Sequence, residues 1–215
     1  MAKTNPQKGL EAALRKAPVV PVMVIDDVNH AVPLARALVK GGLPVLEITL
    51  RTAAALDCIK AIVSEVEGAI IGSGTVLTSQ QLRQSRKAGC VFAVSPGSTG
   101  KLLGAAEDEE GIALLPGAAT ASEAMALLEW GYAIQKFFPA EQAGGAAYLA
   151  SLSSPLPQIK FCPTGGITPA LAPSYFKLAN VITLGGSWMA PKAMVNEGKW
   201  DEIEKLAREA AALRG

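Results

Sequence analysis

The sequence predicts a single-domain α/β protein, a (β/α)8 TIM barrel that occupies residues 1–215 and begins with a short N-terminal helix. Short apolar runs alternate with Ala-rich amphipathic stretches, and eight such runs can be recognised. Their starts recur roughly every two dozen residues, which leaves room for one strand, one helix and two short loops. Eight βα units favour a closed parallel barrel. A doubly wound open sheet with the same alternation is the alternative.

The short apolar runs are the expected strands, and the amphipathic stretches between them are the expected helices. The strands are Val19–Ile25, Val45–Leu50, Ala69–Thr75, Val91–Ser95, Ile112–Leu115, Ile134–Phe138, Ile159–Cys162 and Val181–Leu184. The helices are expected near residues 7–16, 28–40, 53–66, 79–88, 99–107, 120–130, 144–152, 169–178 and 199–213.

Composition limits the classes of protein to which the chain can belong. Its 215 residues fit one domain that is large enough to bury a full core. Half of the residues are hydrophobic and only 5% are aromatic, so the core must consist largely of Ala, Val, Leu and Ile. A formal net charge of +1 supplies no field for nucleic acid or an anionic membrane. The mean hydropathy of +0.29 is compatible with extensive buried surface, including surface between subunits, and Ala-rich helices also raise this value.

Targeting signals and metal-binding patterns are not expected in this sequence. No apolar run approaches the roughly 18 residues of a transmembrane helix, and Met1–Pro6 lacks the apolar core of a signal peptide. Cys58, Cys90 and Cys162 show no CxxC spacing, so we expect three reduced thiols, buried or partly buried, in a cytoplasmic protein. The only histidine, His30, is expected on the surface at the start of a helix, and no metal site is predicted.

The segments that follow the expected strands are unusual, because Thr, Gly and Pro gather there. They include Thr49-Leu50-Arg51-Thr52, Gly72-Ser73-Gly74-Thr75, Ser95-Pro96-Gly97, Pro139-Ala140-Glu141, Pro163-Thr164-Gly165-Gly166 and Gly185-Gly186-Ser187. The helices are followed by plain turns such as Lys40-Gly41-Gly42. In barrel enzymes the site is built at the carboxyl ends of the strands, so the functional residues are predicted at that end.

The second expected strand has charged side chains on the face predicted to point inward. Side chains alternate between the two faces of a strand, so Glu47, Thr49 and Arg51 share one face. A carboxylate and a guanidinium are costly to bury without a purpose. Arg51 comes at the end of the strand, where ligands bind, which favours a functional pair. A structural ion pair that fills the barrel is the alternative.

Lys136 is the lysine that its surroundings single out. It shares one strand face with Ile134 and Phe138, whereas most other lysines lie in polar or helical segments. Apolar surroundings or a neighbouring cation lower the pKa of an amine, which can then act as a neutral nucleophile. The sequence therefore makes Lys136 a candidate nucleophile, with a structural bridge to Glu47 as the alternative. Lys160 begins its strand at the opposite end and is expected to be solvated or structural.

Two glycine pairs, Gly165-Gly166 and Gly185-Gly186, follow the last two expected strands. Phosphate sites in barrels are often built there, from backbone N–H groups that glycine allows a ligand to approach closely. Ser187 adds a hydroxyl to the second pair, and Thr75 is a candidate for contacting a carboxylate. Each pair taken alone is also compatible with an ordinary turn.

Six runs of the sequence resemble the 2-keto-3-deoxy-6-phosphogluconate (KDPG) aldolase family, which also covers 4-hydroxy-2-oxoglutarate aldolase. The runs are Pro18–Val22, Leu46–Thr52, Gly72–Val76, Ser95–Gly97, Lys136–Glu141 and Phe161–Ile167. The resemblance extends from about residue 10 to the end of the chain, and its most specific segments are LEITLRT and KFFPAE. Ser73 departs from the pattern, because the family often has alanine there, and this change is expected to alter polarity beside Thr75.

The resemblance implies a class I aldolase on a (β/α)8 barrel that cleaves KDPG to pyruvate and glyceraldehyde 3-phosphate in the Entner–Doudoroff pathway. It also implies side activity on 4-hydroxy-2-oxoglutarate, a homotrimer, and no cofactor or metal. By resemblance Lys136 is the Schiff-base lysine and Glu47 the acid/base. The implied substrate contacts are Arg51 and Thr75 for the pyruvate carboxylate, Gly165, Gly166, Gly185, Gly186 and Ser187 for phosphate, and Pro96, Phe138 and Thr164 as lining of the pocket.

Two other functions fit parts of the pattern. A metal-dependent phosphosugar epimerase on the same fold would need several inward His and Asp ligands, which the sequence lacks. A phosphate-binding module without catalytic activity would not require Lys136.

Overall fold

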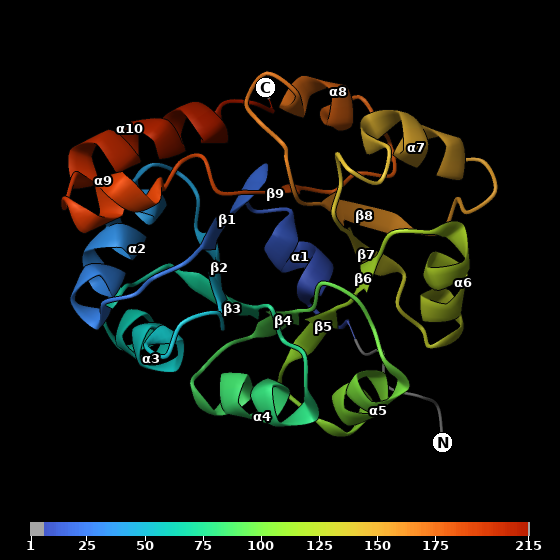
Figure 1. Ribbon diagram of the computed structural model, residues 1–215, viewed down its shortest axis with the longest axis horizontal. Coiled ribbons are helices and arrows are strands. Elements are labelled where there is room, and N and C mark those ends of the chain that lie inside the picture. Colours follow the sequence, from blue (N-terminus) through green and yellow to red (C-terminus); the bar gives the residue numbers. More distant parts are fainter. Residues whose placement is uncertain (1–6, 215) are drawn as a thin grey trace.

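The computed structural model describes residues 7–214 of the chain. Met1–Pro6, where no signal peptide is expected, lies outside the described residues. The strands form a curled inner layer with helices packed around its outside (Figure 1). In chain order the elements are α1 (Leu10–Leu14), β1 (Val19–Met23), η1 (Val28–His30), α2 (Ala31–Lys40), β2 (Val45–Thr49), α3 (Ala55–Glu65), β3 (Ile70–Gly74), α4 (Ser79–Lys87), β4 (Phe92–Val94), α5 (Gly100–Asp108), β5 (Ala113–Leu115), β6 (Gly117–Ala118), α6 (Ala121–Glu129), β7 (Ile134–Phe137), α7 (Gly145–Leu152), β8 (Lys160–Pro163), α8 (Ala172–Phe176), β9 (Leu184–Gly186), α9 (Lys192–Asn196) and α10 (Trp200–Ala211).

The strands pair in parallel in two sheets, which meet at two places. One sheet has the order β5-β4-β3-β2-β1-β9 and the other the order β6-β7-β8. The chain passes from β5 to β6 at Pro116, whose carbonyl accepts the N–H of Lys136 at 2.8 Å. On the other side, isolated bridges pair Thr164 with Gly185 and Phe161 with Val181. The result is an α/β fold with a curled parallel sheet.

The amino-terminal end of the sheet is covered by α1, which lies inside the ring of helices (Figure 1). Gln7, just before α1, is buried and reaches two strands. Its side-chain amide donates to the carbonyls of Leu114 (3.1 Å) and Ile134 (2.6 Å) and accepts the N–H of Ile134 (2.8 Å). The expected leading helix near 7–16 therefore exists and closes the end opposite the strand termini that were predicted to be functional.

Local sequence signals account for where several helices begin. Thr78, Thr99 and Thr120 cap α4, α5 and α6, each accepting a backbone N–H through its hydroxyl. At α6 the cap is reciprocal, because the carboxylate of Glu123 accepts the N–H of Thr120 at 2.9 Å. After α4 the chain turns at Gly89, where φ is +99°, a conformation that glycine adopts readily.

The predicted strands correspond to observed ones, except that the last prediction is displaced. The strand was expected at Val181–Leu184 but lies at Leu184–Gly186. Within the segment that was expected to be the strand, the backbone carbonyls of Val181 and Ile182 accept hydrogen bonds from the guanidinium of Arg214. Neither α9 nor the division of the fifth strand at Pro116 was predicted from the sequence.

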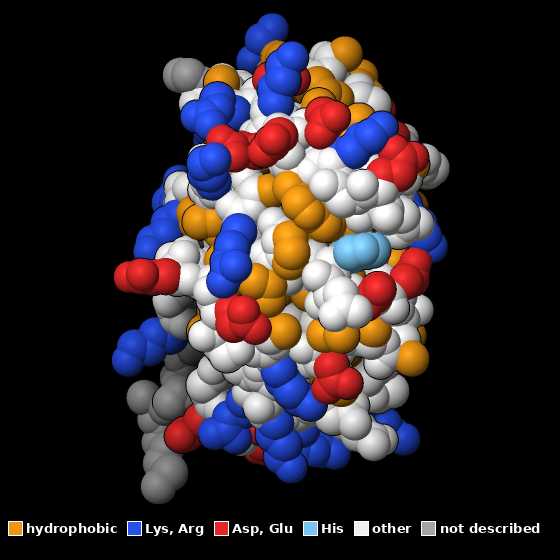
Figure 2. All heavy atoms as spheres, turned by 90° about the vertical axis from the view of Figure 1, so that its left-hand side faces the viewer, with side chains coloured by type: hydrophobic (Ala, Val, Ile, Leu, Met, Phe, Trp, Pro, Cys, Tyr) orange, Lys and Arg blue, Asp and Glu red, His pale blue; other side chains and the backbone are white. Residues whose placement is uncertain are grey.

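The distribution of surface charges and the state of the cysteines agree with what the composition predicts. Figure 2 shows the face formed by α2, α3, α9 and α10, where positive and negative side chains are interspersed. Cys58, Cys90 and Cys162 are free and buried, and burial raises their pKa to about 11, about 12 and about 12, respectively. Among the described helices, none has both the length and the apolar character that crossing a membrane requires.

Candidate active site

Glu47 lies in the middle of β2, in which every residue is buried. The alternation predicted for this strand is visible in its contacts. Thr49 donates its hydroxyl to the carbonyl of Met23 at 2.9 Å, and Glu47 extends over Gly74 of β3. A Cβ at Gly74 would lie 2.2 Å from Glu47 Oε1, so this carboxylate position requires glycine there.

Lys136 extends from β7 toward Glu47, whereas its sequence neighbours face the helices. The amide of Gln135 donates to the carbonyl of Ala124 in α6 at 2.9 Å, and Phe137 stacks on Tyr148 of α7 with ring centroids 5.6 Å apart. Lys136 Nζ lies 3.4 Å from Glu47 Oε1, and the two side chains are 6% and 5% exposed. The fold thus brings together two predicted residues that are 89 positions apart in sequence.

The geometry of this pair favours chemistry over a purely structural bridge. A buried ion pair stabilises a protein only when its geometry is excellent and further hydrogen bonds satisfy both ions. In the part of the chain that the structure describes, Glu47 is the one group that Lys136 Nζ hydrogen-bonds, and the contact is long. The face of Phe138 lies 5.3 Å from the same nitrogen. The amine is thus held by one long hydrogen bond to a carboxylate and by one ring contact.

Cys162 adjoins Lys136 and was not predicted to be part of the site. The two residues are register partners in β8 and β7, so their side chains share a sheet face. Burial raises the pKa of Cys162, which therefore presents a neutral thiol to the Lys136–Glu47 pair. Strand alternation could have identified Cys162, because it lies two residues before Thr164 and therefore on the same face of the strand.

Arg51 and Thr75 lie at the carboxyl ends of neighbouring strands. The N–H of Leu50 donates to the carbonyl of Gly74 at 2.8 Å, which aligns the two strand ends. Arg51 is exposed beyond β2, with its Nε donating to Thr49 Oγ1 at 3.1 Å. Thr75 has a φ of +57°, which is uncommon for a residue other than glycine and is typical of functional sites.

Ser73, the departure from the family pattern, lies on the face of β3 opposite to Glu47. Gly74 faces Glu47, so the side chain of Ser73, one residue earlier, points to the opposite face of β3. There it is fully buried near Cys90, whose thiol pKa it lowers slightly against the larger effect of burial. The serine therefore changes polarity in the layer between sheet and helices.

The two glycine pairs lie side by side at the carboxyl edge. Gly165 and Gly166 have φ values of +108° and +76°, and Thr164 pairs with Gly185. A Cβ at Gly185 would lie 2.2 Å from Thr164 Oγ1, which is buried. Ser187 is exposed at the end of β9. The second glycine pair thus leaves room for the threonine hydroxyl.

Pro96 and Phe138 complete the set of predicted residues. Pro96 is half-buried and packs so closely on Gly117 that a Cβ there would lie 2.3 Å from its carbonyl oxygen. Phe138 follows β7, and its N–H donates to the carbonyl of Ala118 at 3.2 Å. Lys160, by contrast, begins β8 and donates to the carbonyl of Ala179 at 3.2 Å, the structural role that was predicted.

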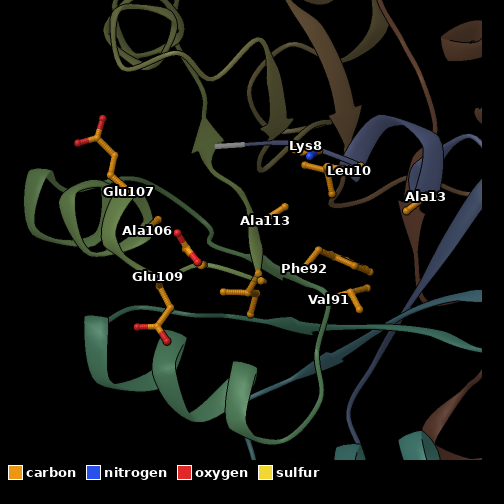
Figure 3. Close-up of a pocket in the computed structure, with 13 residues that line it drawn as sticks. Lys8, Leu10, Ala13, Val91, Phe92, Ala106, Glu107, Glu109 and Ala113 are labelled. Carbon is orange, nitrogen blue, oxygen red and sulfur yellow. The ribbon is translucent and has the colours of Figure 1, made fainter. Parts of the chain in front are cut away.

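A cavity of about 690 Å³ lies elsewhere in the molecule, between α1 and the amino ends of β4 and β5 (Figure 3). Its lining includes Lys8, Leu10, Phe92, Glu107 and Glu109, and no residue of the predicted site. No cluster of three or more His, Cys, Asp or Glu side chains suited to a metal ion occurs within residues 7–214. The cavity is thus separate from the residues predicted to be functional, which lie at the carboxyl edge and around Lys136.

Comparison with known proteins identifies the family. The family model for KDPG and KHG aldolases matches residues 10–206. The chain belongs to this family. The KDPG/KHG aldolase relatives include 2-dehydro-3-deoxy-phosphogluconate aldolase of Pseudoalteromonas atlantica, which is 53% identical over 92% of this chain and 91% of its own length.

Solved KDPG aldolase structures have the same fold. The enzyme of Legionella pneumophila, with pyruvate captured at low pH as a covalent carbinolamine intermediate, is 42% identical with a TM-score of 0.92 and covers 98% of this chain and 100% of its own. The enzyme of Zymomonas mobilis with 3-phosphoglycerate is 46% identical with a TM-score of 0.90, over 96% and 97% of the two chains.

Proposed function

We propose that the chain is a class I aldolase that cleaves KDPG to pyruvate and glyceraldehyde 3-phosphate in the Entner–Doudoroff pathway. The observation that supports this most directly is the buried approach of Lys136 Nζ to Glu47 Oε1 at 3.4 Å. A nucleophilic amine beside a single proton acceptor is what Schiff-base catalysis requires. The carbinolamine captured in the Legionella pneumophila relative supports the same chemistry.

The first half of the reaction forms the covalent intermediate. Lys136 attacks the 2-oxo carbon as a neutral amine, and loss of water from the carbinolamine leaves a protonated imine. Arg51 and Thr75 hold the carboxylate of the substrate, an assignment favoured by their shared place at the carboxyl edge. The iminium withdraws electrons from the bond between carbons 3 and 4, as a Lewis acid would.

The second half breaks the carbon–carbon bond and releases both products. Glu47, directly or through a water, takes the proton of the 4-hydroxyl as the bond breaks and the aldehyde departs. The remaining enamine then receives a proton at carbon 3 from Glu47, and hydrolysis frees pyruvate. One carboxylate thus serves first as base and then as acid.

The phosphate of the substrate is proposed to bind at the glycine pairs and Ser187. The amides of Gly165, Gly166 and Ile167 donate no hydrogen bond within the described residues, which leaves three donors for an anion. Pro96, Phe138 and Thr164 line the pocket between phosphate and lysine. The same donors suit the distal carboxylate of 4-hydroxy-2-oxoglutarate, so we propose a side activity on that compound.

We further propose a closed (β/α)8 barrel that forms a cytoplasmic homotrimer. The crossing at Pro116 and the Thr164–Gly185 bridge support closure, since β5 with β6 then counts as one of eight strands. Three free thiols suit a reducing compartment. The trimer is supported by the family resemblance, and sedimentation equilibrium at a mass other than three times 22.2 kDa would contradict it.

Borohydride trapping tests the catalytic assignment. The wild-type protein incubated with pyruvate and borohydride should gain the mass of one reduced pyruvate, and Lys136→Ala should gain nothing. Lys160→Ala is the matched control, because it removes another strand lysine at the opposite end of the sheet. An adduct that persists in Lys136→Ala would refute the assignment, and activity abolished by EDTA would favour the metal-dependent alternative.

A further inference from the structure

A buried tyrosine holds a carboxylate beneath the turn that follows β8. Tyr175 of α8 is completely buried, and its hydroxyl donates to Glu141 Oε1 in the loop after β7. Burial, together with the neighbouring carboxylate, raises the pKa of Tyr175 well above its usual range, so the phenol stays protonated and remains a donor. The pair ties α8 to the β7–α7 loop.

Glu141 contacts the Gly165-Gly166 turn through both its backbone and its side chain. Its N–H donates to the carbonyl of Gly165 at 3.1 Å, and the N–H of the preceding Ala140 donates to the carbonyl of Thr164 at 2.8 Å. A Cβ at Gly166 would lie only 2.9 Å from Glu141 Cβ, so the glycine backbone rests on this side chain.

The turn itself has little that would hold it in one conformation. Gly165 and Gly166 both have positive φ, and their amides make no hydrogen bond among residues 7–214. Consecutive glycines are the most mobile residues in a chain. The conformation of the turn is therefore set from outside, by the backbone hydrogen bonds of Ala140 and Glu141 and by the side chain of Glu141.

From these contacts we infer that Tyr175 and Glu141 are positioning residues, which fix the Gly165-Gly166 turn for the phosphate group of the substrate. The inference rests on the proposed function. It deepens that proposal by assigning phosphate selectivity to a pair that lies behind the turn. Neither residue takes part in Schiff-base formation or proton transfer. Loss of the pair should therefore weaken binding of the phosphate group and leave the chemistry at the pyruvate half of the substrate unchanged.

Tyr175→Phe tests the inference, because it removes the hydroxyl and keeps the ring. The KM for KDPG should rise about tenfold, the usual effect of losing a hydrogen bond to a charged group. The kcat/KM for the unphosphorylated analogue 2-keto-3-deoxygluconate, and the rate of proton exchange at the methyl of pyruvate, should stay within about twofold of wild type. Glu141→Gln, which retains an acceptor oxygen, should lose less than Glu141→Leu.

Tyr132→Phe is the matched control, since Tyr132 is equally buried but its hydroxyl has no partner among the described residues. It should leave every rate unchanged. Equal losses on the phosphorylated and unphosphorylated substrates would show a merely structural role and overturn the inference, as would an unchanged KM for KDPG. A wild-type protein that forms no pyruvate adduct would overturn the proposed function itself, an outcome that trapping detects separately.

Discussion

At the scale of single residues, the site depends on side chains that are close without being tightly bonded. Lys136 and Glu47 approach to 3.4 Å in a buried space, beside the neutral thiol of Cys162. A shorter contact with more hydrogen bonds would stabilise the ions and make the amine less available. Gly74 contributes by having no side chain, because any Cβ would displace the carboxylate.

Replacement of Glu47 by Gln should separate Schiff-base formation from proton transfer. The variant should still form the pyruvate adduct, more slowly, whereas proton exchange at the methyl of pyruvate should fall by about 100-fold or more. Exchange followed by proton NMR in deuterated water measures this. Glu11→Gln, on the exposed surface, is the control, and exchange at the normal rate in Glu47→Gln would mean that another group is the base.

The sequence was sufficient to predict Glu47 and Lys136, because strand alternation and a charge in an apolar run are both local signals. Cys162 was overlooked as part of the site, although its strand phase matched that of Thr164. The Tyr175–Glu141 pair had no such signal. It depends on how α8 packs on the β7–α7 loop, which involves residues 34 positions apart.

At the scale of elements, each strand begins and ends where its backbone N–H and C=O groups find partners in the neighbouring strands. Seven expected strands have partners where the apolar runs predicted them. The eighth is displaced: Val181 makes only an isolated bridge with Phe161, and Arg214, from beyond α10, donates to the carbonyls of Val181 and Ile182. Such a contact between distant segments leaves no trace in local periodicity, and neither does the break at Pro116.

The capping box of α6 should make stability depend on pH. The N–H of Ala119, followed by the hydroxyl and N–H of Thr120, holds the pKa of Glu123 below its ordinary 4.5. The resulting stabilisation is present above the unfolded pKa and is lost as the pH falls through the lowered, folded pKa. Glu123→Gln should therefore cost up to about 1 kcal/mol at pH 7, since the carboxylate is exposed, and progressively less below pH 4.5.

Urea unfolding at several pH values measures this difference. Glu67→Gln, which changes another exposed carboxylate outside any helix, should show no such dependence. If the loss of unfolding free energy in Glu123→Gln stayed the same at acidic pH, the charge of the carboxylate would not contribute to the cap.

At the scale of the whole molecule, the contacts that close the sheet and the proposed functional residues lie at opposite ends of the strands. The amino end is closed by α1 and by three hydrogen bonds from Gln7 to β5 and β7. The carboxyl end presents the glycine pairs, Arg51 and Lys136. Residues at one end should therefore affect folding without affecting catalysis.

Gln7→Ala should lower the free energy of unfolding by about 2–3 kcal/mol, because it leaves buried backbone groups of Leu114 and Ile134 without partners. The KM for KDPG should not change. The urea midpoint and steady-state kinetics measure the two effects, with Gln80→Ala in the exposed part of α4 as the control. A raised KM at full stability would contradict this separation of the two ends.

The bonds of Gln7 and Arg214 have a practical consequence for anyone who attaches this protein to something else. Gln7 is fixed beside the start of β7, and Arg214 donates to carbonyls just before β9, so both described ends of the chain are held at the amino end of the strands. A support, label or second enzyme joined next to Gln7 or Arg214 is expected to lie on the far side from Lys136. Immobilised or fused forms are therefore expected to keep an open path for substrate.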